Sequence, residues 1–186
     1  WEAMNAASTK PFGFMPFTPG PGVGGHSLPI DPSCQSWRVQ RTLGRGFRFV
    51  ELANDINSHM PDYVVRRLLL ALNKRGRPMV GSRILLLGLA YKKNTGDARN
   101  SPVIRVAELL LRMGAEVRAA DPLVTEPTAI SPAVARVDAT PEEIAAADAV
   151  VLLTDHDAFT AADVSRHAHY VLDCRRALSG PNVETF

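Results

Sequence analysis

The second half of the chain alternates short apolar runs with segments of helical spacing, and no other feature restricts the fold as much. The run Arg83–Gly88 is apolar from Ile84 to Leu87, which is typical of a central strand in a parallel sheet buried on both faces. Because strands joined by helices run parallel with right-handed crossovers, residues 79–186 are predicted to form an α/β, Rossmann-like domain. Further strands are predicted at Glu116–Ala120, Ala149–Leu153 and Tyr170–Asp173, and helices at Ser101–Met113, Pro141–Ala147 and Asp157–Arg166.

Residues 1–78 are predicted to hold a loop and a long central helix. The helix covers Phe47–Lys74, is kinked or restarted at Pro61, and ends before Pro78. Its apolar stripe fits a core face or an interface with a second copy, and the sequence does not separate the two. The tail of a helix is expected over residues 1–10 and short helical turns over residues 33–45.

Composition narrows the class of protein. With 186 residues, 46% hydrophobic and 22% charged, the chain can bury a core, and its net charge of +2 argues against a nucleic-acid or membrane surface. The distant Cys34 and Cys174 lack metal or redox spacing, so a reduced, cytoplasmic chain is expected. The three late histidines, His156, His167 and His169, also lack metal-ligand spacing. No signal peptide or membrane span is predicted, and the start at Trp1 suggests the C-terminal portion of a longer protein.

The loop Pro19–Pro32 combines glycines and flanking prolines with the ionisable pair His26 and Asp31, which lie close to Ser27 in the sequence. Glycine lets a ligand or another backbone come close, and proline stiffens the flanks. These properties favour a functional loop over a plain connector.

The first strand of the second half is followed by basic residues rather than by a dinucleotide fingerprint. Gly88-Leu89-Ala90-Tyr91-Lys92 is not G-x-G-x-x-G, and Asp121 lies too far along to bind a ribose. An NAD pyrophosphate site is therefore not expected here. Lys92, Lys93 and Arg99 fit a phosphate or uronate ligand, and a solvated basic loop is the alternative.

The loop resembles the catalytic loop of the nucleotide-sugar 6-dehydrogenases, which reads Gly-Gly-His-Cys-Ile-Pro-x-Asp. The preceding run, Trp1 to Phe17, resembles the branch of that family acting on UDP-N-acetylhexosamines. The segment Gly88–Lys92, followed by Thr95, Asp97, Arg99, Ser101 and Pro102, resembles the family's UDP-binding domain.

The resemblance implies oxidation of the C6 hydroxyl of a UDP-sugar to a carboxylate with two NAD, bound mainly by an N-terminal domain absent from these residues. It implies a nucleophilic cysteine at the position of Ser27, an aspartate that orients water or acts as base at Asp31, and a catalytic asparagine at Asn57. It also implies a homodimer or higher homo-oligomer. The residues that it assigns to substrate binding are Phe17, Gly22, Gly24, Gly25, His26, Lys92, Arg99 and Arg175.

Ser27 differs from the family pattern at the position of the cysteine nucleophile, on which the chemistry depends most. In the family, the thiolate captures the aldehyde intermediate and gives a thioester, whereas a serine hydroxyl is scarcely ionised near neutral pH. Complete oxidation is therefore expected to be strongly impaired while substrate binding survives. A naturally divergent copy and a deliberate substitution are both open.

The alternative function from another class is a non-catalytic UDP-sugar-binding or dimerisation module. A hydrolase triad of Ser27, His26 and Asp31 is disfavoured, because no G-x-S-x-G elbow is present and adjacent residues seldom point together. His26 is expected to shape the loop rather than to activate Ser27. The Gly-Gly-His sequence before Ser27 favours a UDP-N-acetylhexosamine as substrate, and UDP-glucose and UDP-N-acetylmannosamine both remain open.

Overall fold

The computed structural model describes residues 1–126 and 130–186. Within them the second half of the chain forms a six-stranded parallel sheet in the order β3-β2-β1-β4-β5-β6. This is the doubly wound arrangement, in which the chain reverses its direction of winding between the neighbouring strands β1 and β4. The strands are β1 (Arg83–Leu87), β2 (Glu116–Ala120), β3 (Ala135–Arg136), β4 (Ala149–Leu152), β5 (Val171–Asp173) and β6 (Val183–Thr185).

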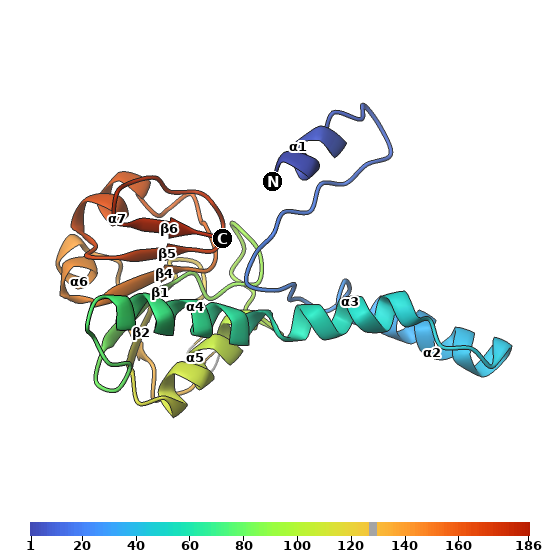
Figure 1. Ribbon diagram of the computed structural model, residues 1–186, viewed down its shortest axis with the longest axis horizontal. Helices are drawn as coiled ribbons and strands as arrows, with labels where there is room; N and C mark the ends of the chain where they lie inside the picture. Colours follow the sequence, from blue (N-terminus) through green and yellow to red (C-terminus); the bar gives the residue numbers. More distant parts are fainter. Residues whose placement is uncertain (127–129) are drawn as a thin grey trace.

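Helices cover both faces of the sheet (Figure 1). The central strand β1 shows why: Ile84 and Leu86 join one buried cluster, and Leu85 and Leu87 join the other. The first cluster includes α4 (Met60–Lys74) and α5 (Pro102–Arg112), and the second includes residues of α6 (Pro141–Ala146) and α7 (Ala161–His167). Successive residues of β1 point to opposite faces of the sheet, and these four are all apolar. Both faces must therefore be covered, which gives the three-layer α/β architecture.

The predicted α/β class and Rossmann-like sheet are confirmed, and three details differ. The strands β3 and β6 were not predicted, because β3 has two residues and β6 carries Glu184 within a half-buried edge. The last helix begins at Ala161 rather than Asp157, since the chain first makes a turn in which the Phe159 amide donates to the His156 carbonyl.

The expected short turns over residues 33–45 are one helix, α2 (Asp31–Leu43). Pro32 in its first turn preorganises the start, and Gly44 at φ +65° closes its end in the left-handed conformation. The local signals therefore define a full helix, and the prediction of separate turns was wrong.

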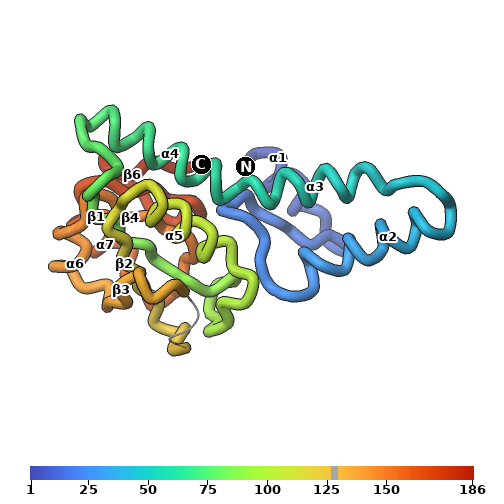
Figure 2. Tube along the Cα trace, turned by 90° about the horizontal axis from the view of Figure 1, so that it is seen from below, coloured from blue at the N-terminus to red at the C-terminus, as the bar shows by residue number. Residues whose placement is uncertain are grey.

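The central helix divides at His59 into α3 (Arg48–Ser58) and α4, with Pro61 in the first turn of α4. This confirms the predicted restart, since proline fits only the first turn of a helix. Figures 1 and 2 show α2 and α3 as a helical arm that extends away from the sheet, whereas α4 packs on it. The short helix α1 (Glu2–Ala7) precedes the loop.

None of the helices in residues 1–126 and 130–186 is both long enough and apolar enough to span a lipid bilayer.

Candidate functional site

The glycine loop lies against the carboxyl-terminal edge of the parallel sheet, and its glycines are there because the backbone comes so close. A Cβ on Gly24 would stand 2.6 Å from the Asn100 carbonyl oxygen and 2.8 Å from the Tyr91 Cβ. Gly25, at φ +88°, would place a Cβ 3.0 Å from the Tyr91 ring. Any side chain here would force the loop off the sheet domain.

The same loop touches two further elements of the sheet domain. A Cβ on Gly20 would meet the Arg175 guanidinium at 2.7 Å, and one on Gly22 would meet the Pro102 Cβ at 3.1 Å. Arg175 follows β5 and Pro102 begins α5. The loop therefore runs across the strand ends, where ligands bind in doubly wound folds.

Asn57 fixes the loop from the other side. Its Oδ1 accepts the Val23 amide at 2.8 Å, and its Nδ2 donates to the Val23 carbonyl at 3.3 Å. A side-chain amide that pairs with both groups of one peptide residue acts as a surrogate strand partner. Asn57 therefore holds the loop four residues before Ser27.

Ser27 lies in a turn between the loop and α2. Its carbonyl oxygen accepts the amides of Ile30 and Asp31 at 3.0 and 2.9 Å. The side chains of His26, Ser27 and Asp31 are all exposed, and Asp31 is the first residue of α2. Within the described residues, no hydrogen bond joins the Ser27 hydroxyl to the side chain of His26 or Asp31, so these three residues do not form a preformed triad there.

The basic residues at this edge fall into two groups. Lys93 pairs with Asp157 at 2.7 Å, and Arg99 pairs with Asp97 at 2.6 Å and lowers the pKa of that carboxyl to about 2. Lys92, by contrast, has no hydrogen-bond or ion-pair partner anywhere in residues 1–126 and 130–186. The predicted basic cluster is therefore largely neutralised, and Lys92 keeps its charge available.

Arg175 is the second cation at this edge without a carboxylate in ion-pair distance, as far as the described part of the chain extends. Its Nε donates to the Leu153 carbonyl at 2.6 Å, which fixes the guanidinium beneath Gly20. Burial lowers the pKa of Arg175, so a bound anion would relieve the loss of hydration. Lys92 and Arg175 are thus suited to bind phosphate oxygens.

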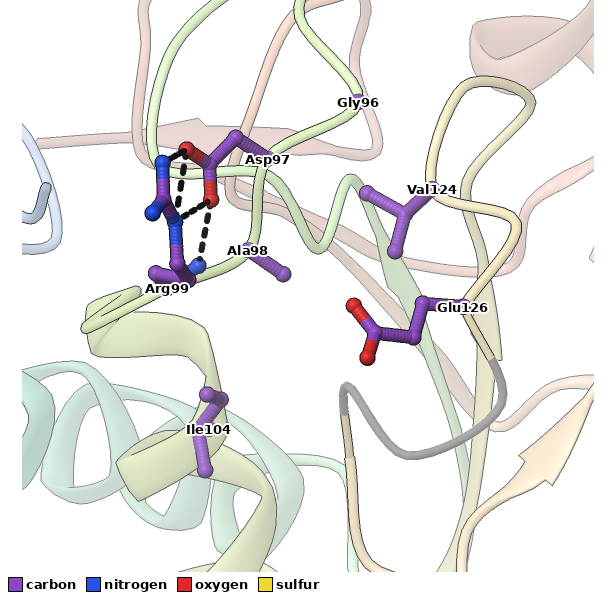
Figure 3. A pocket seen from close by; sticks show the side chains of 7 residues that line it. All are labelled: Gly96, Asp97, Ala98, Arg99, Ile104, Val124 and Glu126. Atoms are coloured by element: carbon purple, nitrogen blue, oxygen red, sulfur yellow. Dashed lines mark hydrogen bonds and ion pairs between the residues drawn. The ribbon is translucent and has the colours of Figure 1, made fainter.

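A cavity of about 450 Å³ lies beside this edge, between the loops that follow β1 and β2 (Figure 3). Asp97 and Glu126 contribute carboxylates to its wall, and its cation, Arg99, is held by Asp97. The close-up shows Ile104 of α5 on the side of Arg99, and Val124 beside Glu126 on the opposite side. The acidic lining makes this cavity a poorer phosphate site than the edge with Lys92 and Arg175.

The backbone after β1 does not form an NAD pyrophosphate site. The amides of Leu89 and Ala90, which would have to face the phosphates, donate to the Asp121 carboxylate at 2.6 and 3.0 Å. A Cβ on Gly88 would stand 2.5 Å from the Thr154 backbone, so this glycine serves strand-to-loop packing. The residues present therefore do not fit an NAD pyrophosphate.

Asp121 and its partner His156 are residues that the sequence analysis did not assign to the site. The signal available was their position: each follows a strand, β2 or β4, at the edge where parallel strands end. His156 is buried, His167 is half-buried and His169 is exposed. Among the residues that the structure describes, no group of three or more His, Cys, Asp or Glu side chains is placed to hold a metal ion.

Phe17, which was predicted to bind substrate, makes none of the contacts described above between the loop and the sheet domain. Its side chain is exposed, and within the described residues it has no ring contact. Cys34 is exposed on α2 and Cys174 is buried, and both are free thiols.

Two family models match the chain. The UDP binding domain of the UDP-glucose/GDP-mannose dehydrogenase family matches residues 85–180, and the central domain of the same family matches residues 1–59. The glycine loop lies within the central-domain match, and α4 lies between the two matches.

Several curated proteins are similar over most of the chain. A UDP-N-acetyl-D-mannosamine dehydrogenase of Pyrococcus horikoshii is 32% identical over 98% of this chain and 42% of its own length. An NDP-N-acetyl-D-galactosaminuronic acid dehydrogenase of Ralstonia solanacearum is 30% identical over 94% of this chain and 40% of its own length. The chain thus spans less than half of these relatives.

Solved structures agree in fold. The UDP-D-ManNAc dehydrogenase from P. horikoshii superposes with a TM-score of 0.77 at 30% identity, over 99% of this chain and 43% of that one. The NDP-N-acetyl-D-galactosaminuronic acid dehydrogenase from Methanosarcina mazei gives a TM-score of 0.79 at 26% identity, over 100% and 42% of the two chains.

Proposed function

This chain belongs to the UDP-glucose/GDP-mannose dehydrogenase family, and from that premise we propose that it is the loop-bearing and UDP-sugar-binding portion of an NAD-dependent nucleotide-sugar 6-dehydrogenase. Residues 79–186 bind the nucleotide sugar, and residues 1–78 contribute the loop and the helices. The substrate is a UDP-hexose or UDP-N-acetylhexosamine whose C6 hydroxyl becomes a carboxylate. A cytoplasmic location fits an enzyme that uses nucleotide sugars and NAD.

The observation that carries this proposal is the contact between the loop and the sheet edge. Gly24 and Gly25 place the backbone before Ser27 against Tyr91, next to Lys92. A diphosphate held by Lys92 and Arg175 at the strand ends would set its attached sugar toward the loop. Gly22, His26, Arg99, Phe17 and Asp31 are assigned to this space by the family resemblance.

The proposed reaction uses NAD, but in this proposal residues 1–186 do not bind it. The Leu89 and Ala90 amides already bind Asp121, so the first strand of this sheet offers no pyrophosphate site. In the proposal, a part of the protein outside these 186 residues binds NAD. These residues alone are therefore expected to bind substrate without oxidising it.

Ser27 limits what the loop can do chemically. The side chain is exposed and has no hydrogen bond to a base within the described residues, so its hydroxyl remains protonated near neutral pH. Asn57 and the glycines nevertheless hold the loop in place. We expect substrate binding to be retained and full oxidation to be strongly impaired.

A second candidate function follows from the same residue. If serine is the native residue at position 27, the chain is a non-catalytic UDP-sugar-binding or dimerisation module. The two candidates are separated by the Ser27→Cys variant of a polypeptide that also contains the NAD-binding part. Under the enzyme proposal, Ser27→Cys raises turnover of UDP-sugar by at least about a hundredfold. Equal turnover of the two forms would contradict the expected impairment, and no turnover by either would favour the module.

The helical arm supports a homodimer or higher homo-oligomer. Phe49, Leu52 and Ile56 form a stripe along α3 and are 76%, 55% and 56% exposed. Trp37 on α2 is 59% exposed. Large apolar side chains gathered on one element mark a surface that another chain covers.

The two adjacent lysines give a matched test of ligand binding. Lys92→Met removes the unpaired charge, and we expect it to weaken UDP binding by about tenfold. Lys93→Met removes a charge that already pairs with Asp157, and we expect a change below about threefold. Calorimetric titration with UDP measures both. Equal losses in the two variants would contradict the assignment of Lys92.

A panel of UDP-sugars in the same titration ranks the substrates. We expect UDP-N-acetylhexosamines to bind more tightly than UDP-glucose, by no more than about a hundredfold, because one pocket contact discriminates by about 1–3 kcal/mol. A preference for UDP-glucose would contradict the N-acetylhexosamine assignment.

A further inference from the structure

A buried hydrogen-bond network joins the three loops that follow β1, β2 and β4, and the proposed reaction leaves it unexplained. Its centre is the pair His156 and Asp121, whose side chains are both 0% exposed and whose Nε2 and Oδ2 atoms are 3.0 Å apart. Buried ionisable groups are retained only when every polar atom has a partner. Here every polar atom of the pair has one.

The Asp121 carboxylate connects the loop after β1 to the loop after β2. Its Oδ2 accepts the amides of Leu89 and Ala90, and its Oδ1 accepts those of Leu123 and Val124 at 2.8 and 3.0 Å. Burial alone would raise the pKa of Asp121, but these four donors together lower it. The carboxylate therefore stays ionised and fixes the backbone immediately before Tyr91.

His156 connects the same loop to β4. The Asn94 amide donates to its Nδ1 at 2.9 Å, so the ring proton must be on Nε2, which donates to Asp121. The ring thus accepts a hydrogen bond at Nδ1 from Asn94, at the end of the segment that carries Lys92, and donates one from Nε2 to Asp121, which binds the start of that segment. The ring proton cannot move from Nε2 to Nδ1 without breaking one of these two bonds.

Asn94 completes the attachment. It adopts φ +55°, a left-handed conformation that is uncommon outside glycine and that asparagine tolerates better than most residues. Its side chain accepts the Asp157 amide at 3.1 Å and donates to the Asp157 carboxylate at 2.6 Å. The turn at Asn94 is therefore tied to the β4 loop through both backbone and side chain.

We infer that Asp121, His156 and Asn94 are positioning residues, which hold the segment 91–94 in the conformation that presents Lys92 to the phosphates of a nucleoside diphosphate. The segment is bound at its start through Leu89 and Ala90 and at its end through Asn94, and Lys92 lies between. The ligand named here rests on the proposed function. The conformational control of the segment does not, and it is tested separately.

Two isosteric variants of the histidine separate its two bonds. His156→Gln places an amide where Nε2 was and keeps a donor for Asp121, but it removes the acceptor for the Asn94 amide. His156→Asn offers an oxygen near Nδ1 and keeps that acceptor. His167→Gln is the matched control, since within the described residues the side chain of His167 has one hydrogen bond, to the carbonyl of Asp163 on its own helix.

Amide hydrogen exchange of the 186-residue chain without ligand tests the conformational part. In His156→Gln we expect exchange of the two hydrogen-bonded amides in residues 91–94, those of Tyr91 and Asn94, to accelerate by at least about tenfold, with β1 and β4 unchanged. His156→Asn is expected to restore most of the protection, and His167→Gln to leave it unaltered. Unchanged exchange over residues 91–94 in His156→Gln would overturn the inference.

Titration with UDP tests the coupling to Lys92. His156→Gln is expected to weaken UDP binding by about fivefold or more in the wild-type background and to have no further effect in Lys92→Met. An equal loss in both backgrounds would overturn the link to Lys92. A wild-type chain that did not bind UDP, while exchange over residues 91–94 still responded to His156→Gln, would overturn the proposed function and support the positioning network.

Discussion

The helical arm and the sheet domain differ in how far their apolar side chains are exposed to solvent. In the sheet domain, every residue of β1 from Ile84 to Leu87 is 0% exposed. In the arm, Phe49 is 76% exposed and each residue of α3 is exposed or half-buried. The sheet domain thus contains the contacts that stabilise it. The arm has helix-forming signals but few contacts of its own, so its apolar stripe fits a surface that is covered when the protein assembles.

The glycines of the two regions also differ in how closely other atoms surround them. Substitution of a closely packed glycine in the sheet domain is expected to cause the largest loss of stability. Gly88→Ala would place a Cβ 2.5 Å from the Thr154 backbone at φ +85°. We expect a loss of about 3 kcal/mol or more in the free energy of unfolding. Gly44→Ala in the arm has a similar φ of +65° but open space around it, and should cost about 1 kcal/mol. Urea unfolding measures both, and equal losses would show that steric contact is not the deciding factor.

Two leucines on successive helices compare packing in the same terms. Leu68 on α4 is 0% exposed, and Leu68→Ala is expected to cost about 2–5 kcal/mol. Leu52 on α3 is 55% exposed, and Leu52→Ala should change stability by less than about 0.5 kcal/mol at low protein concentration. If a second copy covers the arm, the cost of Leu52→Ala grows with protein concentration. A constant cost would contradict the proposed interface.

The sheet domain and the helix α3 were largely predictable from the sequence, whereas α2 was not predicted as one helix. Ile84 to Leu87 and the helix starts at Ser101 and Pro141 are local signals that agree with the fold. The short strands β3 and β6 gave no such signal, because pairing with a neighbour rather than their own composition makes them strands. For α2, Pro32 in the first turn and Gly44 at the end were local signals of one helix, and the prediction of short turns over residues 33–45 did not use them.

At the candidate site, the close approach of the loop backbone was predictable from the sequence, but the hydrogen bonds and ion pairs were not. Glycines in a stiff loop indicated close approach, and the structure supplies the partners, Tyr91 and Asn100. The pairing of Arg99 with Asp97 and of Lys93 with Asp157 could not be inferred, since ion pairs depend on loop geometry. Asp121 and His156 lie 35 positions apart and meet only through the parallel strand order.

A smaller effect concerns the contact that joins the arm to the loop. Asn57→Ala removes both bonds to Val23 and is expected to free the loop, accelerating exchange of the Val23 amide by about tenfold and weakening UDP-sugar binding by less. Asn54→Ala on the same helix is the control, because Asn54 binds Ser33 on α2 and not the loop. If Asn54→Ala had the same effect at Val23, general loosening of the arm would explain both.

The smallest expected effect is the pH dependence of the exposed pair Asp97 and Arg99. The Arg99 guanidinium lowers the pKa of Asp97 to about 2, below its ordinary value of 3.8. The pair therefore stabilises the fold above that ordinary value, and the contribution is lost as pH falls through about 2. Arg99→Gln should raise the midpoint of acid unfolding by less than about half a pH unit. A lower midpoint would contradict the sign of this interaction.

Parallel calorimetric titrations of the 186-residue chain with UDP and with NAD test the central claim most directly. Lys92 and Arg175 lie at the strand ends without ion-pair partners in the described residues, while Asp121 occupies the amides that a dinucleotide would need. The prediction is saturable binding of UDP and none of NAD over the same concentration range. Binding of NAD without UDP would contradict the claim and make this sheet the coenzyme domain.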